Sequence, residues 1–331
     1  MAVANKALAG LGPHVKTVRP AGAVERAEWP PGTDGLLKKC NFPPHGTPVT
    51  CAVSGGPDSL AMLVLACAAG CVAHAVHVDH GLRPGSCEEA ALVRTSAERL
   101  GASFEGLFAA VAHGPDLEAR ARLARYELFP EGALVGHTAD DQAETLLLNL
   151  LRGAGLDGLS AMRADGGGHR KVLRPILGLR RSETAALVAA LGLSVVDDPS
   201  NFEPRFRRNR ARHEVLPLLR DVAGRDPVPL LARTAGLLAE DADFLAALAW
   251  GLDPTDVKAL RAAPKPLAKR ALRLWLRGSE GAEQHPPSSA ELERVWLVVM
   301  GEAKACELPG GRRVSRRSGR LDVQATRFNQ A

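Results

Sequence analysis

A glycine- and serine-rich turn carries the strongest chemical signal in the sequence. It follows an apolar run at 48–53 and precedes a helical run at 60–69. Its six residues are Ser54, Gly55, Gly56, Pro57, Asp58 and Ser59. The glycines let the backbone approach an anion, and the N–H groups and dipole of the following helix point at the same place. An aspartate here can hold Mg²⁺ against phosphate oxygens. We therefore predict a phosphate-binding loop; a plain capped turn is the alternative.

A second group of chemical residues follows a short apolar run at 133–136. His137 comes first, and Asp141 and Glu144 lie three positions apart in the helix predicted at 140–152. Both carboxylates therefore project from one side of the first helical turn. Next to a nucleotide loop, these residues are predicted to handle Mg²⁺ and proton transfer. Ordinary capping and helix-dipole chemistry is the alternative.

A histidine-rich segment ends the apolar run that begins at Cys71. A metal site of His74, His77 and His80 is one hypothesis. Alternate residues of a strand face opposite sides, however, so His77 is expected to point away from the other two. We favour His80 as part of the wall of the nucleotide pocket, because the neighbouring strand end adjoins the phosphate loop.

Arginines form two further groups. Arg122 lies on a helix predicted at 116–129, where it either pairs with Glu118 or faces a triphosphate or a developing charge. The second group lies at the predicted junction of two domains and contains no acid. Its members are Arg205, Arg207, Arg208, Arg210 and Arg212. A block of one sign suits a nucleic-acid phosphate backbone, whereas solvated faces usually mix signs. A weaker cluster follows near the end of the chain, at Arg312, Arg313, Arg316, Arg317 and Arg320.

The elements that position these residues alternate between strands and helices up to about residue 200. Such alternation predicts an α/β fold, a parallel sheet covered by helices on both faces, with ligands at the carboxyl ends of its strands. Residues 208–305 are mainly helical in pattern, with helices expected at 227–248, 256–277 and 289–300, and a short strand pair is expected after Gly310. We predict an extension at 1–47, a nucleotide-binding catalytic domain at 48–207 and a smaller helical domain with a basic tail at 208–331.

Composition limits the class of protein. The formal net charge is +5, which fits an anionic partner. The six cysteines form no CxxC pair, which favours a protein with free thiols. No apolar run approaches the length that a membrane span or a signal peptide needs. We therefore expect a cytoplasmic protein without membrane contact, and we leave monomer and homodimer both open.

Seven segments, taken in order, resemble the tRNA(Ile)-lysidine synthetases of the PP-loop ATP-pyrophosphatase superfamily. They are AVSGGPDSL, HVDHGLRPGS, EARARLARY, GHTADDQAETLLLNLLRGAGLDGLSAM, RPIL, DDPSN and RNRARHEVLPLL. The SGGxDS pattern alone indicates only the superfamily, whereas the ordered set is much more specific. The similarity is dense over about 48–220 and looser in the helical region.

The resemblance implies an ATP-dependent ligase that first adenylates the wobble cytidine of a tRNA(Ile) with a CAU anticodon. Free L-lysine then displaces AMP. It also implies that Asp58 holds Mg²⁺, that Arg122 steadies the adenylated intermediate, and that Asp141 and Glu144 bind metal or lysine. Three alternatives stay open: a tRNA 2-thiolase, which would need cysteine pairs; an ammonia-using amide ligase, which would not need the arginine block; and a non-catalytic RNA-binding protein.

Overall fold

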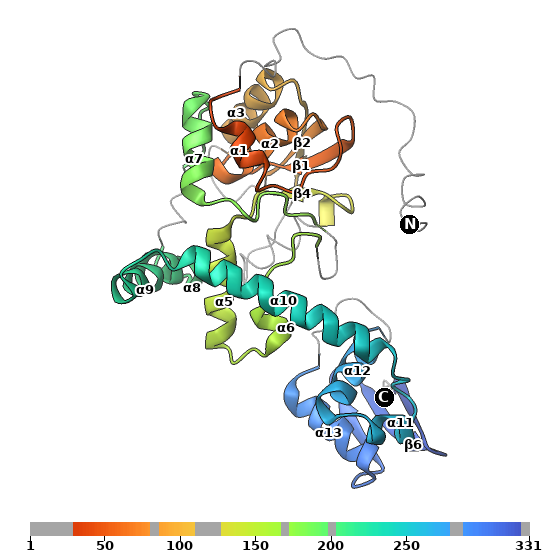
Figure 1. Cartoon of the computed structure of the whole chain (residues 1–331). Helices are drawn as coiled ribbons and strands as arrows, with labels where there is room; N and C mark the ends of the chain where they lie inside the picture. The colour runs from red at the N-terminus through yellow and green to blue at the C-terminus, as the bar shows by residue number, and fades with distance from the viewer. Residues whose placement is uncertain are drawn as a thin grey trace, which may run out of the picture. The chain divides into compact units, whose positions relative to one another are not determined.

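The computed structural model describes residues 29–79, 86–109, 127–166, 172–197, 203–278 and 287–325. The chain forms two compact units (Figure 1). The first unit comprises residues 1–138 and 172–200, and the second comprises 139–171 and 201–331. Two elements of the second unit, α5 (Ala139–Leu151) and α6 (Leu156–Leu159), therefore precede the last segment of the first unit in the chain.

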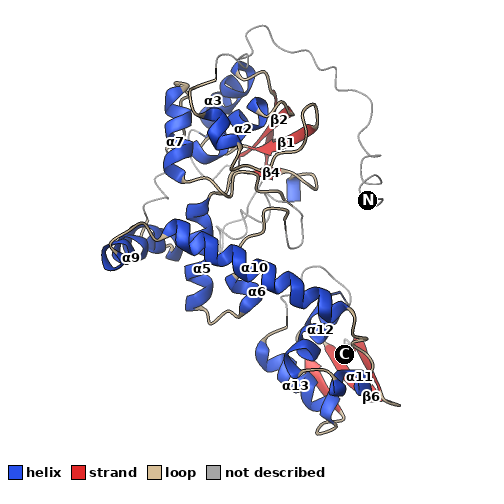
Figure 2. Cartoon of the chain, viewed as in Figure 1, coloured by secondary structure: helices blue, strands red, loops and turns tan. Residues whose placement is uncertain are grey.

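The first unit contains a parallel four-stranded sheet in the order β3-β2-β1-β4, drawn in red in Figure 2. Its strands are β1 (Pro48–Ala52), β2 (Val72–Asp79), β3 (Ser103–Phe108) and β4 (Leu134–Val135). Apolar residues of the central strands point into the core, as Val49, Cys51 and Ala75 show. The predicted parallel α/β fold is confirmed, and β1, β2 and β4 lie at the apolar runs of the sequence.

Helices cover this sheet. They are α1 (Thr33–Leu37), α2 (Pro57–Ala68), α3 (Ser86–Arg99) and α7 (Arg181–Ala190). Residues 60–66 of α2 are all buried, because α2 packs between the sheet and α7. A helix that is apolar on every side belongs in such a position. The sequence pattern did not predict α7, although its residues Leu187 and Val188 join the core.

The second unit is built around one long helix, α10 (Val228–Trp250). α10 packs against α5 (Ala139–Leu151) and α6 (Leu156–Leu159). Its fully buried positions recur every seven residues and are mostly small: Val228, Ala235, Ala242 and Ala249. Small residues at this spacing let a neighbouring helix approach closely. Between 203 and 228 lie α8 (Arg207–Arg210), the π-helix η3 (Ala211–Val215) and α9 (Leu216–Ala223).

The C-terminal part of the second unit differs from the sequence prediction in two details. The helix expected at 256–277 is two helices, α11 (Val257–Ala262) and α12 (Lys265–Gly278). Ala263 is extended because the following Pro264 disfavours helical backbone at that position. The expected strand pair is a three-stranded antiparallel sheet of β5 (Ala305–Leu308), β6 (Arg312–Arg317) and β7 (Arg320–Ala325). α13 (Ser289–Met300) packs on this sheet.

No helix in the described part of the chain combines the length and the hydropathy that crossing a membrane requires.

Candidate functional site

The predicted phosphate loop lies where the direction of strand addition reverses in the first unit. β1 pairs with β2 on one side and with β4 on the other. The chain runs from β1 through β2 to β3 on one side, and β4 is then added on the opposite side of β1. In open α/β sheets, ligands bind at the carboxyl ends of strands at such a switch point. Residues 54–59, which follow β1, therefore lie where an α/β protein binds a ligand.

The first glycine of the loop is required by its conformation and by its neighbour. Gly55 has φ 87°, a value that favours glycine. Its carbonyl accepts a hydrogen bond from the Val196 N–H at 3.0 Å. A Cβ at position 55 would lie 2.5 Å from Val196 Cγ2. A side chain here would therefore push the loop away from the segment that holds it.

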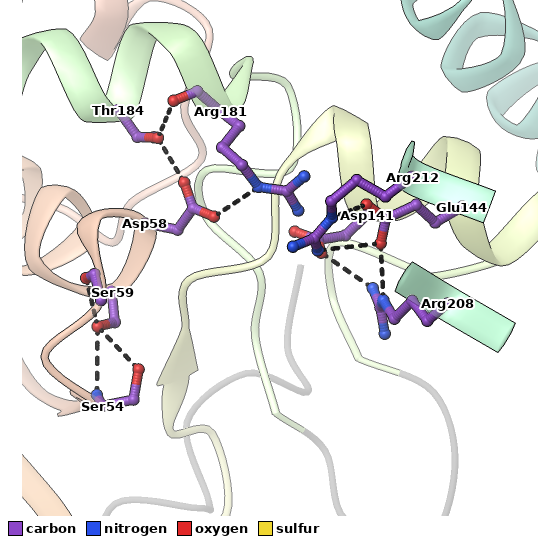
Figure 3. Close-up of polar contacts among 10 residues, drawn as sticks. Ser54, Asp58, Ser59, Asp141, Glu144, Arg181, Thr184, Arg208 and Arg212 are labelled. Carbon is purple, nitrogen blue, oxygen red and sulfur yellow. Dashed lines mark hydrogen bonds and ion pairs between the residues drawn. The ribbon is translucent and has the colours of Figure 1, made fainter. Parts of the chain in front are cut away.

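The loop then opens α2 in a way that suits an anion. Gly56 is the N-cap residue and Pro57 occupies the first turn, and no side chain caps the helix. Because a helix leaves its first N–H groups without partners inside the helix, an anion can take the place of a capping side chain. Nearby, Ser59 Oγ donates to the Gly56 carbonyl at 2.9 Å and accepts from the Ser54 N–H at 3.2 Å (Figure 3). These bonds hold the loop in its shape.

Asp58 is held by two residues of α7. Thr184 donates its hydroxyl hydrogen to Asp58 Oδ1, and Arg181 Nε–H donates to Asp58 Oδ2 at 3.2 Å (Figure 3). Asp58 is therefore paired with a cation in this structure. Arg181 and Thr184 were not among the residues that the sequence singled out. They lie 123 and 126 positions away in the chain, and no motif connects them to the loop.

The residue that follows β4 approaches the phosphate loop very closely. A Cβ on Gly136 would lie 2.8 Å from the Asp58 carbonyl oxygen and 2.9 Å from Ser59 Cα. The next residue, His137, accepts at Nδ1 a hydrogen bond of 3.1 Å from Nε–H of the buried Arg174. A ring nitrogen that accepts is unprotonated, so in the neutral ring the proton is on Nε2.

In the second unit, the two predicted carboxylates form a cluster with two arginines. Glu144 is completely buried, and its oxygens accept from Arg208 Nε–H and Arg212 Nε–H, each at 2.7 Å (Figure 3). Arg208 also donates to Asp141 Oδ1 at 3.0 Å. The cluster therefore combines two carboxylates with two guanidinium groups, and the arginines satisfy the buried charge of Glu144.

A π-turn, η3, interrupts the helical segment between α8 and α9 beside these arginines. The Leu216 N–H donates to the Ala211 carbonyl, five residues back, which defines the π-turn of η3. Pro217 explains it: a proline has no N–H, and its ring collides with the carbonyl four residues before it. A widened turn accommodates that ring. π-turns within helices often occur at functional sites.

Two known protein families match the chain, one in its N-terminal and one in its C-terminal part. The PP-loop domain matches residues 36–219, and the TilS substrate-binding domain matches residues 256–321. The tRNA(Ile)-lysidine synthase of Nocardia farcinica is 39% identical, over 86% of this chain and 94% of its own length. That of Rhodococcus erythropolis is 41% identical, over 69% of this chain and 73% of its own length.

The chain belongs to the tRNA(Ile)-lysidine synthase family. Among solved structures, the U34-tRNA thiolase NcsA of Methanococcus maripaludis superimposes with a TM-score of 0.50 at 16% identity, covering 63% of this chain and 78% of the thiolase. At that identity the similarity concerns the fold alone.

In this member of the lysidine synthase family, the arginine block at 205–212 divides into two kinds. Arg208 and Arg212 face the buried acids. Arg205 is 72% exposed, pairs with Glu203 and lies 4.7 Å from the Phe206 ring. Arg210 pairs with Glu214 on the surface. Arg207 is exposed and makes no ion pair with any described residue.

The basic tail of this synthase family member is similarly divided. Arg312 is buried and donates to the Leu276 carbonyl at 2.9 Å, so it has a structural role. Asp253 accepts from the hydroxyl and the N–H of Thr255 and from Arg320, and these bonds lower the pKa of Asp253 to about 2. Arg316 and Arg317 are exposed on β6, which leaves their charges facing solvent.

Two predicted residues, His80 and Arg122, lie outside the described residues. Within β2, the other two histidines face different surroundings, as the strand alternation predicts. His77 is buried and its Nδ1 lies 2.9 Å from the Val53 carbonyl oxygen, whereas His74 contacts Ser103 and Glu105 at the surface. Within the described ranges, no group of three or more His, Cys, Asp or Glu side chains is arranged to hold a metal ion.

Proposed function

We propose that this chain is an ATP-dependent ligase that joins L-lysine to C2 of the wobble cytidine of the tRNA(Ile) with a CAU anticodon. One observation carries the proposal. The SGGPDS loop lies at the switch point of a PP-loop domain, in a chain that is 39% identical along 86% of its length to a named tRNA(Ile)-lysidine synthase. The fold supports an ATP site at this loop, and the family relationship supports tRNA as the acceptor.

The proposed reaction has two steps. In the first, O2 of the cytidine attacks the α-phosphorus of ATP, a new P–O bond forms, and the bond to the β-phosphate breaks to release pyrophosphate. In the second, the ε-amine of lysine attacks C2 and loses a proton. The C2–O bond then breaks, and AMP leaves with its electron pair. The product carries a C–N bond at C2.

The first unit supplies the nucleotide site. The glycine turn of Gly55 and Gly56, with the N-terminus of α2, suits the phosphates of ATP. We propose that the hydroxyls of Ser54 and Ser59 turn from their bonds within the loop to donate to these phosphates when ATP binds. The Asp58 carboxylate suits Mg²⁺, which usually binds proteins through one or two carboxylates together with substrate phosphates. When bound, Mg²⁺ would neutralise charge on the triphosphate. Arg122 remains our proposal for steadying the adenylated base.

Asp141 and Glu144 remain our proposed acids for lysine or metal, under one condition. Both oxygens of Glu144 accept from arginines, and Asp141 is bonded to Arg208. Glu144 can therefore receive an ammonium or a metal ion only if an arginine releases it, and Oδ1 of Asp141 is already shared with Arg208. Asp141 keeps some exposure, which makes it the more accessible member of the pair.

For tRNA, we propose that exposed arginines of the second unit contact phosphates. Arg205, Arg207 and Arg210 are the accessible members of the 205–212 block, and Arg316 and Arg317 add charge on β6. Arg208 and Arg212, which pair with Glu144, would hold this segment against α5 rather than contact RNA directly. We also propose cytoplasmic activity, as expected for a tRNA-modifying enzyme, and a homodimer remains a proposal.

The decisive experiment is ATP–pyrophosphate exchange with purified full-length protein, with and without the CAU-anticodon tRNA(Ile). We expect exchange only with tRNA, and incorporation of labelled lysine into that tRNA when lysine is added. Asp58→Ala should bind tRNA but abolish exchange. Exchange without tRNA would indicate an amide ligase, and tRNA-dependent incorporation of sulfur in place of lysine would indicate a thiolase; either outcome would contradict the proposal.

A further inference from the structure

The contact between Arg181 and Asp58 joins the start of α7 to the first turn of α2. Arg181 is the first residue of α7, and its Nε lies 3.2 Å from Asp58 Oδ2 (Figure 3). Both side chains are largely buried, with 25% and 20% of their side-chain surface exposed. The Arg181 guanidinium therefore lies beside the turn that we assign to the phosphates of ATP, within the same compact unit.

This position creates a competition for one carboxylate. In the structure, the charge of Asp58 is neutralised by Arg181. A divalent cation that binds Asp58 must weaken that ion pair, because two cations facing the same carboxylate repel each other. A released guanidinium would then lie next to the anionic phosphates. Guanidinium groups bind phosphate well, because their planar fork can donate two parallel N–H bonds.

We propose that Arg181 is a further phosphate-binding residue of the nucleotide site. It pairs with Asp58 while the site lacks nucleotide, and it transfers to the phosphates when ATP arrives with its divalent cation. The inference rests on the proposed ATP-binding function and adds a specific residue to it. In both states each of the two side chains faces a group of opposite charge, so neither is left buried without a partner.

Thr184 is a positioning residue that holds the Asp58 carboxylate during this exchange. It is fully buried one turn after Arg181, and its hydroxyl donates to Asp58 Oδ1. The same hydroxyl lies 2.8 Å from the Arg181 carbonyl oxygen. Thr184 therefore fixes one oxygen of Asp58 independently of the guanidinium. When Arg181 leaves, this bond keeps the carboxylate aimed at the site of the cation.

The test measures Mn²⁺ and nucleotide binding separately in full-length protein, without tRNA or lysine. Arg181→Gln removes the competitor, so free Mn²⁺, followed by electron paramagnetic resonance, should bind about two- to fivefold more tightly. The same variant should bind the Mn²⁺ complex of a non-hydrolysable ATP analogue about tenfold more weakly, because it can no longer donate a charge-assisted hydrogen bond to phosphate. A merely structural arginine would not produce two effects of opposite sign.

Matched variants define the outcomes. Arg99→Gln, an exposed arginine at the end of α3, removes the same charge and should leave both affinities unchanged. Arg181→Lys keeps the charge, so its affinity for Mn²⁺ should stay near that of wild type. Its affinity for the ATP analogue should fall. Thr184→Val should weaken Mn²⁺ binding, whereas Thr184→Ser keeps the hydroxyl and should bind Mn²⁺ as wild type does. Thr95→Val on the surface of α3 is the control.

Unchanged Mn²⁺ affinity in Arg181→Gln, or Mn²⁺ and analogue affinities that fall together, would overturn the proposal. These measurements need no tRNA. If wild-type protein binds the analogue but forms no lysidine, the proposed acceptor is wrong while the role of Arg181 is still decided by the two affinities. If wild-type protein does not bind the analogue at all, both proposals fail.

Discussion

Arg208 donates its Nε–H to the fully buried carboxylate of Glu144 across 2.7 Å, although the two residues lie 64 positions apart in the chain. Together with Arg212, this contact fastens the arginine block at 205–212 to α5. A carboxylate without solvent is tolerated only when charged or polar groups satisfy it. The pair therefore couples the predicted acids to the predicted tRNA-binding segment within one unit.

The first prediction concerns Glu144. Glu144→Gln should lower the free energy of unfolding by about 3 kcal/mol, because two partly buried guanidiniums lose their charged acceptor. Combining it with Arg208→Gln should cost less than the sum of the two single variants, since both break one network. Urea denaturation measures both effects. Glu240→Gln on the exposed side of α10 is the control. A Glu144→Gln variant with wild-type stability that stalls after adenylation would identify a lysine-binding acid instead.

The second prediction separates the two kinds of arginine. Arg205→Gln and Arg207→Gln together should leave thermal stability nearly unchanged and weaken tRNA binding. The log–log salt slope of binding should fall by roughly 0.7 to 0.9 for each tRNA phosphate that the variant no longer neutralises. Arg208→Gln with Arg212→Gln should instead lower the melting temperature. Titration of tRNA at several salt concentrations, with melting curves, measures both. If the surface pair changed stability and not the slope, its assignment to tRNA would be wrong.

Local patterns in the sequence were sufficient to predict the sheet and the phosphate loop. Period-two apolar runs and glycine turns are encoded by neighbouring residues, so β1, the loop and α2 lie where expected. α7 was missed because its sequence carries only a weak amphipathic pattern and its role depends on α2, far away in the chain. The break before Pro264 is local as well, and the proline alone could have predicted it.

The partners of the site residues could not be predicted in the same way. Spacing placed Asp141 and Glu144 on one side of a helix, but it gave no indication that arginines more than sixty positions later would bind them. The sequence marks the arginine block only by its single sign. It does not show that Arg208 and Arg212 pair with an acid of α5, whereas the other paired members, Arg205 and Arg210, bind acids nearby in the chain. Ion pairs between distant segments depend on tertiary packing, which a single sequence does not display.

The third prediction concerns acid stability. Burial raises the pKa of the Glu183 carboxyl, but the Arg180 N–H and the Lys39 ammonium outweigh it, so the folded pKa lies below the ordinary value of 4.5. The unfolded chain then binds more protons, so this contribution is present above about pH 4.5 and is lost as pH falls through the folded pKa.

Glu183→Gln should therefore be less stable than wild type near neutral pH, and the difference should shrink below about pH 4.5. Denaturation at a series of pH values measures it. Glu98→Gln on the exposed side of α3 is the comparison variant and should follow wild type. A difference between Glu183→Gln and wild type that stays constant down to strongly acidic pH would show that the carboxyl does not act through its charge.

The fourth prediction concerns the close approach of β4 to the phosphate loop. In Gly136→Ala, the new methyl carbon would lie 2.8 Å from the Asp58 carbonyl oxygen and 2.9 Å from Ser59 Cα. These are backbone atoms, so the strand end and the loop must separate. We expect a loss of about 1–3 kcal/mol in stability from overpacking and a roughly tenfold weaker ATP affinity.

Gly236→Ala adds the same methyl to open space on α10 and should instead stabilise the protein by about 0.5–1 kcal/mol. Thermal melting and nucleotide titration of both variants measure the contrast, because the two differ only in what the methyl group meets. Wild-type melting and ATP affinity in Gly136→Ala would show that the loop does not depend on this contact to keep its shape.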